Sequence, residues 1–271
     1  MPLELLSVSI VKRSAGRSAV QPAAYQSGEK LHDARRDTTY YPPKKRDEDL
    51  RYTELMLPKG SPDWGREEFW NEVEARELRK DSQLARAFIG SLPRPLPPEW
   101  RRELAREFAQ TLTEQGMAVD LAIHEGKAAD ELPNHHVHYL VTMRPLDEEG
   151  FGKKNTAWNR REQLAHWRSE WGRITNEYLE DYGLDDRIDM RSYEARGLDR
   201  IPQRHLGHKA HQMEKRGVET QTGNYNRHVR HLNLAKSIDY ETTPEEVIQQ
   251  EQWEHEHEHN RPLERAKGRG R

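Results

Sequence analysis

The sequence contains no cysteine. This absence excludes disulfide bonds, thiolate zinc sites, iron–sulfur clusters and cysteine nucleophiles. No apolar run reaches the roughly 18 residues of a membrane-spanning helix, so we expect no membrane insertion. The N-terminus has its apolar stretch before its charged residues and lacks a small-residue cleavage site, which is unlike a signal peptide. We therefore expect a cytoplasmic protein.

Apolar residues are also scarce. They make up 33% of the 271 residues, whereas charged residues make up 34%, and the net charge is only −3. This composition predicts a thin core for the length, organised as one large domain or two small ones, with part of the chain as a solvated tail. The seven tryptophans and ten tyrosines argue against disorder of the whole chain.

The charges are segregated along the chain. Residues 191–236 carry ten Lys or Arg against four Asp or Glu, whereas residues 239–258 carry eight acidic residues and no Lys or Arg. A basic stretch of this kind can follow a phosphate backbone, and an acidic run is typical of a solvated tail. We predict a domain over 1–236, including the basic segment, and a charged tail over 237–271.

Hydrophobic periodicity indicates an α+β fold with a mainly antiparallel central sheet and helices packed on it. The expected strands are 3–12, 53–57, 117–124 and 135–143, and residues 32–50 read as a charged loop. The expected helices are 18–30, 64–90, 98–115 and 158–182.

Two of these strands place three histidines together. Side chains alternate between the faces of a strand, so His136 and His138 point the same way and His135 points to the other face. If the two strands pair, His124 comes opposite them. Three imidazoles can hold a divalent cation and leave positions open for substrate or water. Asp120 shares the face of His124 and can orient a ligand imidazole through its other N–H.

A three-histidine site is compatible with metal-assisted hydrolysis, with oxygenase chemistry and with phosphoryl transfer to or from DNA. The geometry of the histidines alone does not choose between these reactions. Other motifs in the sequence are needed to choose between them.

Several segments together resemble the MobA/MobL family of plasmid relaxases, which are HUH endonucleases. The metal motif of that family is similar to DLAIH (120–124) and NHHVHYLVTMR (134–144), with His135 where the family usually has proline. The N-terminal family motif is similar to RSAVQPAAYQSGEKL (17–31), from which Gln21 and Pro22 depart. TELMLP, WNEVEARELRKDSQLAR and IDMRSYEARGLDRIPQRHLG (188–207) resemble further family blocks in the family's order. The resemblance covers about residues 3–217.

The resemblance implies site- and strand-specific nicking of single-stranded DNA at a plasmid transfer origin, which initiates conjugative mobilization. By the family pattern Tyr25 is the nucleophile, and His124, His136 and His138 hold a divalent metal, Mg²⁺ or Mn²⁺. The implied metal lies on the exposed face of the sheet. The implied partners are the origin DNA, accessory mobilization proteins and the type IV coupling and secretion machinery of a bacterium that carries the plasmid.

A tyrosine nucleophile needs a general base or a nearby cation to activate it, because a free phenol has a pKa near 10 and is almost wholly protonated at neutral pH. Asp120 is the first supporting carboxylate, and Glu74 is a further candidate, as are Glu54 and Glu77. In the basic segment we predict contacts to DNA phosphates from Arg191, Arg196, Arg200 and Arg204.

Three alternatives remain. A rolling-circle replication initiator uses the same chemistry, but commonly places its tyrosine after the histidine pair, whereas Tyr25 precedes the pair. A three-histidine metallohydrolase would leave Tyr25 a structural role. A DNA-binding module with a structural metal needs a fourth ligand, and none is evident near these strands.

Overall fold

The computed structural model describes residues 5–42, 49–127, 132–204 and 206–237. Contacts divide the chain into two units, with the division between Met190 and Arg191. The strands of the first unit are β1 (Leu6–Lys12), β2 (Leu31–Asp33), β3 (Thr38–Tyr40), β4 (Leu50–Met56), β5 (Gln83–Ser91), β6 (Val119–Lys127), β7 (Pro133–Thr142), β8 (Leu146–Asp147) and β9 (Gly150–Phe151). Its α-helices are α1 (Val20–Ser27), α3 (Arg66–Arg76), α4 (Pro98–Thr113) and α5 (Arg161–Asp181), with short 3₁₀ turns at Arg13–Ala15 and Thr156–Asn159.

The first unit is built on a five-stranded sheet with the order β1-β5-β7-β6-β4. Every neighbouring pair in this sheet is antiparallel. Two small hairpins, β2–β3 and β8–β9, lie outside it. The predicted α+β class with an antiparallel central sheet is therefore confirmed.

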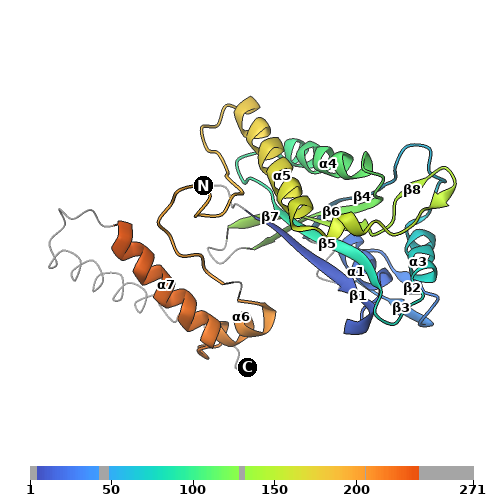
Figure 1. The fold of residues 1–271 in the computed structure, drawn as a ribbon, viewed down its shortest axis with the longest axis horizontal. Helices are drawn as coiled ribbons and strands as arrows, with labels where there is room; N and C mark the ends of the chain where they lie inside the picture. The colour runs from blue at the N-terminus through green and yellow to red at the C-terminus, as the bar shows by residue number, and fades with distance from the viewer. Residues whose placement is uncertain (1–4, 43–48, 128–131, 205, 238–271) are drawn as a thin grey trace, which may run out of the picture. The chain divides into compact units, whose positions relative to one another are not determined.

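One face of the sheet is covered by α4 and α5, and α1 and α3 lie on the other (Figure 1). Alternation along β7 sends Val137, Tyr139 and Val141 into the core beneath α4 and α5. Leu140 points to the opposite face and packs in the core beneath α1 and α3. The two faces of β7 thus carry different sets of side chains.

The helices α4 and α5 form where the sequence predicts them. In α4, which has Pro98 in its first turn, Leu104, Phe108 and Leu112 recur every four residues and are fully buried. In α5 the buried stripe includes Trp167, Trp171 and Ile174. The ring centroids of Phe108 and Trp171 lie 5.2 Å apart in an edge-to-face contact, which joins the two helices above the sheet.

The expected long helix over 64–90 is wrong, because α3 ends at Arg76 and β5 begins at Gln83. Leu84 and Phe88 keep the four-residue spacing of a helix. However, β5 is an inner strand between β1 and β7 and is covered on both faces, so its apolar residues do not alternate with polar ones. Periodicity cannot separate such a strand from a buried helix.

The expected loop over 32–50 is only partly correct. Leu31–Asp33 pairs with Thr38–Tyr40 in a short hairpin, and β4 already begins at Leu50. Residues 43–48 lie outside the described residues.

The second unit contains α6 (His208–Lys215) and α7 (Gln221–Ser237). Glu214 in α6 accepts hydrogen bonds from the backbone N–H of Thr220 and from Arg227, both at 2.6 Å. The amide side chains of Asn226 and Asn233 in α7 each bond the N–H and C=O of one extended residue, Arg204 and Ile201 respectively. These bonds hold the segment 201–204 along α7.

The predicted boundary at residue 236 stays a prediction, because residues 238–271 lie outside the described residues. Within the part of the chain that the structure describes, none of the helices combines the length and apolar character needed to cross a membrane.

Candidate active site

Three histidines meet on the face of the sheet that carries α1 and α3. The register of β6 and β7 places His124 opposite His136, and Ala122 opposite His138. The ring centroids are 4.8 Å apart for His124 and His138, 5.0 Å for His136 and His138, and 5.7 Å for His124 and His136. One nitrogen from each ring lies within 4.8 Å of the others. The strand pairing predicted from the sequence therefore brings the three imidazoles together.

Hydrogen bonds set the orientation of two of these rings. Nε2 of His124 lies 2.7 Å from the backbone oxygen of Gln26, and Nδ1 of His136 lies 2.9 Å from the backbone oxygen of Asn134. Because a carbonyl oxygen only accepts, each of these nitrogens is the donor. The lone pairs of the neutral rings are then on Nδ1 of His124 and Nε2 of His136. This is the way in which ligand histidines are commonly oriented.

The donor set fits a divalent transition metal. Three neutral imidazoles supply nitrogen ligands, which suit borderline cations better than Mg²⁺, a cation that prefers oxygen. His124 is fully buried, whereas His136 and His138 are partly exposed. The resemblance implies a metal on the exposed face of the sheet. His124 does not fit this expectation, because α1 covers the part of β6 that carries it.

Tyr25 lies on α1, directly before the residue whose carbonyl binds His124. Its side chain is 43% exposed. The helix that carries it begins at Val20, whose N–H donates a 3.1 Å hydrogen bond to the hydroxyl of Ser18. It ends at Ser27, and the next residue, Gly28, has a φ of 74°. The C-terminal end follows the sequence pattern, since Gly is a common residue after a helix, whereas the N-cap residue is Ala19 and Ser18 stands one residue before it.

Asp120 is fully buried on the same face as His124, as expected. Its carboxylate accepts two 3.1 Å hydrogen bonds from Nε of Arg66 and a 2.8 Å hydrogen bond from Nε1 of Trp70. Burial raises the pKa of Asp120 to about 6, and the charge and hydrogen bonds of Arg66 and Trp70 oppose this rise. The carboxylate thus takes part in a buried ion pair with α3, and the ring N–H of His124 that it was expected to orient binds the carbonyl of Gln26 instead.

Glu74 is also buried, on α3. Its Oε1 accepts a 2.7 Å hydrogen bond from the backbone N–H of Ala19, and its Oε2 is paired with Arg13. Ala19 directly precedes α1, so Glu74 satisfies an unpaired donor at the start of the helix that carries Tyr25.

The other two candidate carboxylates are paired as well. Glu54 accepts a 2.9 Å hydrogen bond from Arg106 and a 2.7 Å hydrogen bond from the hydroxyl of Tyr52. Glu77 binds Arg144 at 2.8 Å and Lys154 at 3.0 Å.

Gln26 and Arg66 were not singled out from the sequence. Gln26 stands inside the N-terminal motif, but its contacts to β6 depend on how α1 packs. Arg66 is one of many arginines, and only the fold shows that its side chain is 9% exposed and bound to Asp120. No spacing rule in the sequence identifies either residue.

The four predicted DNA-binding arginines lie in the second unit. Arg191, Arg200 and Arg204 are exposed, and Arg196 is partly exposed. The guanidinium carbon of Arg204 lies 3.9 Å from the centroid of the Tyr225 ring, and that of Arg196 lies 5.9 Å from Tyr193. A guanidinium stacked on a ring keeps its N–H groups available at the edges for an anion.

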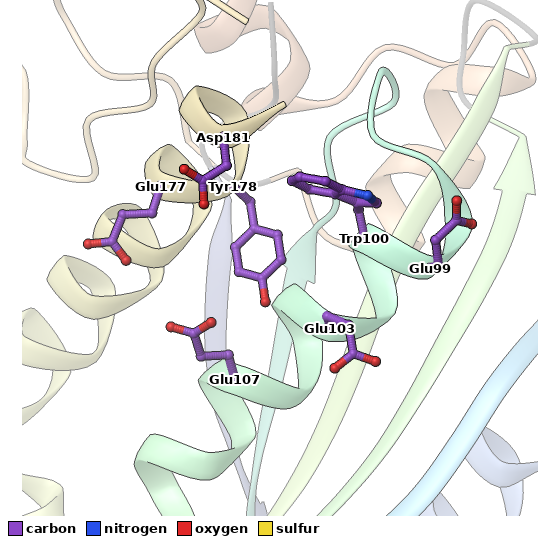
Figure 2. A pocket seen from close by; sticks show the side chains of 7 residues that line it. All are labelled: Glu99, Trp100, Glu103, Glu107, Glu177, Tyr178 and Asp181. Carbon is purple, nitrogen blue, oxygen red and sulfur yellow. The ribbon is translucent and has the colours of Figure 1, made fainter. Parts of the chain in front are cut away.

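A separate groove of about 400 Å³ lies between α4 and α5. Figure 2 shows the side chains that line it, Glu99, Trp100, Glu103, Glu107, Glu177, Tyr178 and Asp181. Burial and, to a smaller extent, a hydrogen bond to Glu107 raise the pKa of Tyr178 to about 12. Five carboxylates repel DNA phosphates, so this groove is unsuited to nucleic acid.

Known proteins resemble this chain over most of its length. The model of the MobA/MobL family matches residues 17–216. The conjugal transfer protein TraA of Agrobacterium fabrum is 35% identical over 241 residues, which cover 76% of this chain and 21% of that protein. The mobilization protein MobL of Acidithiobacillus ferridurans is 33% identical over 258 residues, which cover 84% of this chain and 66% of that protein.

Solved structures include one that is similar in both sequence and fold. It is described as "Molecular Basis of Vancomycin Resistance Transfer in Staphylococcus aureus" and is 34% identical, with a TM-score of 0.62. The match covers 70% of this chain and 98% of that chain. The chain spans only about a fifth of the TraA protein that it matches. The match to the family model extends over most of the described residues and includes Tyr25 and all three histidines, and the chain therefore belongs to the MobA/MobL family.

Proposed function

We propose that this chain nicks one strand of DNA at a plasmid transfer origin through a covalent 5′-phosphotyrosine link to Tyr25, and so initiates conjugative mobilization. One observation carries the proposal. The carbonyl of Gln26, the residue after Tyr25, accepts a 2.7 Å hydrogen bond from His124 of the three-histidine cluster. An exposed tyrosine and a candidate cation site therefore belong to one local structure.

In the proposed reaction the phenol of Tyr25 gives up its proton to water, and its oxygen attacks the scissile phosphorus in line. The bond from phosphorus to the 3′-oxygen breaks, and this oxygen takes up a proton and leaves as a free 3′-hydroxyl. A new ester bond joins the tyrosine to the 5′-phosphate. The ester conserves the energy of the broken bond, so a later 3′-hydroxyl can reverse the step and reseal the strand.

His124, His136 and His138 would hold the cation. When bound, a divalent cation supplies positive charge that stabilises the extra negative charge on the phosphate in the transition state. Of the two expected metals, three nitrogen ligands favour Mn²⁺ over Mg²⁺. Asp120 and Glu74 accept hydrogen bonds from arginines, which supports a role in holding the site.

The second unit is proposed to contact the DNA backbone through Arg191, Arg196, Arg200 and Arg204. The stacking of Arg204 on Tyr225 supports this role, because it orders the guanidinium without using its donors. The reaction takes place in the cytoplasm of a bacterium that carries the plasmid. Accessory mobilization proteins and the type IV coupling and secretion machinery complete the proposed set of partners.

The test uses single-stranded oligonucleotides tiled across candidate origins of the source plasmid, each labelled at its 3′ end. With Mn²⁺ we expect the label to migrate with the protein on a denaturing gel, because the tyrosine is joined to the 3′ fragment. Tyr25→Phe should abolish this band. Tyr182→Phe is the matched control, since Tyr182 is 44% exposed against 43% for Tyr25.

Cleavage that survives Tyr25→Phe and leaves no protein-linked label would mean that water is the nucleophile. The three-histidine metallohydrolase would then replace the relaxase.

A further inference from the structure

The helix that carries Tyr25 has only eight residues. A helix this short is not stable by itself in water, so its position depends on bonds to the rest of the domain. Hydrogen bonds tie it at both ends. At its start, Glu74 accepts the N–H of Ala19 at 2.7 Å.

At the other end, Gln26 makes two hydrogen bonds to one strand. Its side-chain Nε2 donates to the backbone oxygen of Asp120 at 2.8 Å, and its own backbone oxygen accepts from Nε2 of His124 at 2.7 Å. Both bonds are buried, and Gln26 itself is 5% exposed. Asp120 and His124 are four residues apart on β6, so the two bonds fix both the position and the direction of the helix end.

Arg66 supports this junction from α3. Its Nε donates to both carboxylate oxygens of Asp120 at 3.1 Å, and its Nη2 donates to Thr53 of β4 at 2.8 Å. Its Nη1 is paired with Glu29, two residues after the end of α1. One side chain thus joins α3, β4, β6 and the segment that follows α1. Arginine is suited to this role because its donors form a rigid planar fork.

We infer that Gln26 is a positioning residue of the transesterification, which sets the phenol of Tyr25 relative to the metal-ligand strand. The inference rests on the proposed function for its kinetic consequence. The geometric part, in which the side-chain amide of Gln26 holds its carbonyl against His124, can be tested without DNA.

The kinetic consequence follows from the demands of in-line attack. Reacting atoms must be held about 3–3.5 Å apart, and a displacement of about 1 Å costs on the order of a hundredfold in rate. Gln26 contacts Asp120 and His124 and not the reacting atoms. Its loss should therefore lower the rate of the chemical step and leave DNA affinity unchanged.

The first experiment compares Gln26→Met with the wild type. Methionine fills a similar volume but has no N–H donor, so it removes the bond to Asp120 and keeps the packing. We expect the single-turnover rate of adduct formation at saturating oligonucleotide to fall by about ten- to a hundredfold. The Kd for the oligonucleotide should stay the same, and the Tm should fall by only a few degrees, because one buried hydrogen bond is lost. Gln21→Met is the control, because Gln21 is an exposed glutamine on the same helix.

The second experiment follows the Nε2 proton of His124 in metal-free protein, by ¹H–¹⁵N NMR of histidine rings. The buried bond to Gln26 should protect this proton from exchange with water, and Gln26→Met should raise the exchange rate by tenfold or more. The resonance is assigned by its loss in His124→Ala.

The two experiments separate the inference from the proposed function. If wild-type protein forms no adduct but Gln26→Met accelerates proton exchange at His124, the proposed function fails and the structural junction stands. If adduct forms and Gln26→Met is as fast as the wild type, the inference is overturned, whatever the NMR result. Parallel losses of rate, Tm and DNA affinity would also overturn it, because they indicate a general loss of fold.

Discussion

The two faces of the central sheet differ in what they bury. The face under α4 and α5 is apolar and aromatic, with Phe88, Phe108 and Trp171 in its core. The face under α1 and α3 buries His124, Asp120 and Glu74 as well as apolar residues. Buried charges cost free energy unless they are paired, so the ionisable groups on the second face stabilise the fold less than apolar side chains do. One face therefore stabilises the domain, and the other holds the residues of the candidate active site.

The largest expected effect is on the histidine face. His138→Ala removes one of three metal ligands and should lower the rate of adduct formation on the order of a thousandfold, since cation stabilisation of the phosphate contributes several kcal/mol. Mn²⁺ affinity, measured by calorimetry, should fall in parallel. His135→Ala is the matched control, because His135 is on the same strand but points to the other face, where it lies 3.5 Å from Glu125. Equal losses in both variants would contradict the assignment of the site.

A substitution on the apolar face should lower the stability of the fold and leave the reaction rate unchanged. Phe108→Ala removes a fully buried ring that contacts Phe88, Tyr139 and Trp171, and should lower the free energy of unfolding by about 3–5 kcal/mol. Urea denaturation measures this loss. The rate of adduct formation per folded molecule should not change. Gln110→Ala, at an exposed position of the same helix, should be nearly neutral.

Stability should also depend on pH through Asp120. Its pKa is raised to about 6 in the folded protein, above that of an unfolded aspartate, so the folded state binds the proton more tightly. The stability that this group contributes is present below about pH 4 and is lost as the pH rises through about 6. We expect the unfolding free energy of the wild type minus that of Asp120→Asn to fall by about 3 kcal/mol between pH 4 and pH 7. A difference that rises over this range would show that Arg66 outweighs burial.

The smallest expected effect is on DNA affinity and comes from a substitution in the second unit. Arg204→Ala should weaken binding of a single-stranded oligonucleotide several-fold and lower the slope of log Kd against log salt by about 0.7, the value for one phosphate contact. Fluorescence anisotropy at several salt concentrations measures both quantities. Arg173→Ala is the control, since Arg173 on α5 is paired with Glu170 and Glu177. An unchanged slope in Arg204→Ala would remove this residue from the DNA contacts.

The sequence was sufficient to predict the histidine cluster, because strand alternation and one pairing decide where His124, His136 and His138 point. It was sufficient for α4 and α5 as well, since each buries one regular stripe. It failed at β5, where an inner strand covered on both faces has no alternating pattern. The hydrogen bonds of Gln26 and Arg66 could not be predicted from the sequence either. They join α1, α3 and β6, which are far apart in the sequence, and no local pattern reports such contacts.

The most direct measurement is the identity of the residue that carries the DNA. After reaction with the origin oligonucleotide, the adduct is digested with nuclease and trypsin and analysed by mass spectrometry. Cleavage after Arg17 and Lys30 releases residues 18–30, in which Tyr25 is the single tyrosine. We predict a nucleotide joined through its 5′-phosphate to Tyr25 in this peptide. Cleaved DNA together with an unmodified peptide 18–30, or a nucleotide on another peptide, would contradict the account.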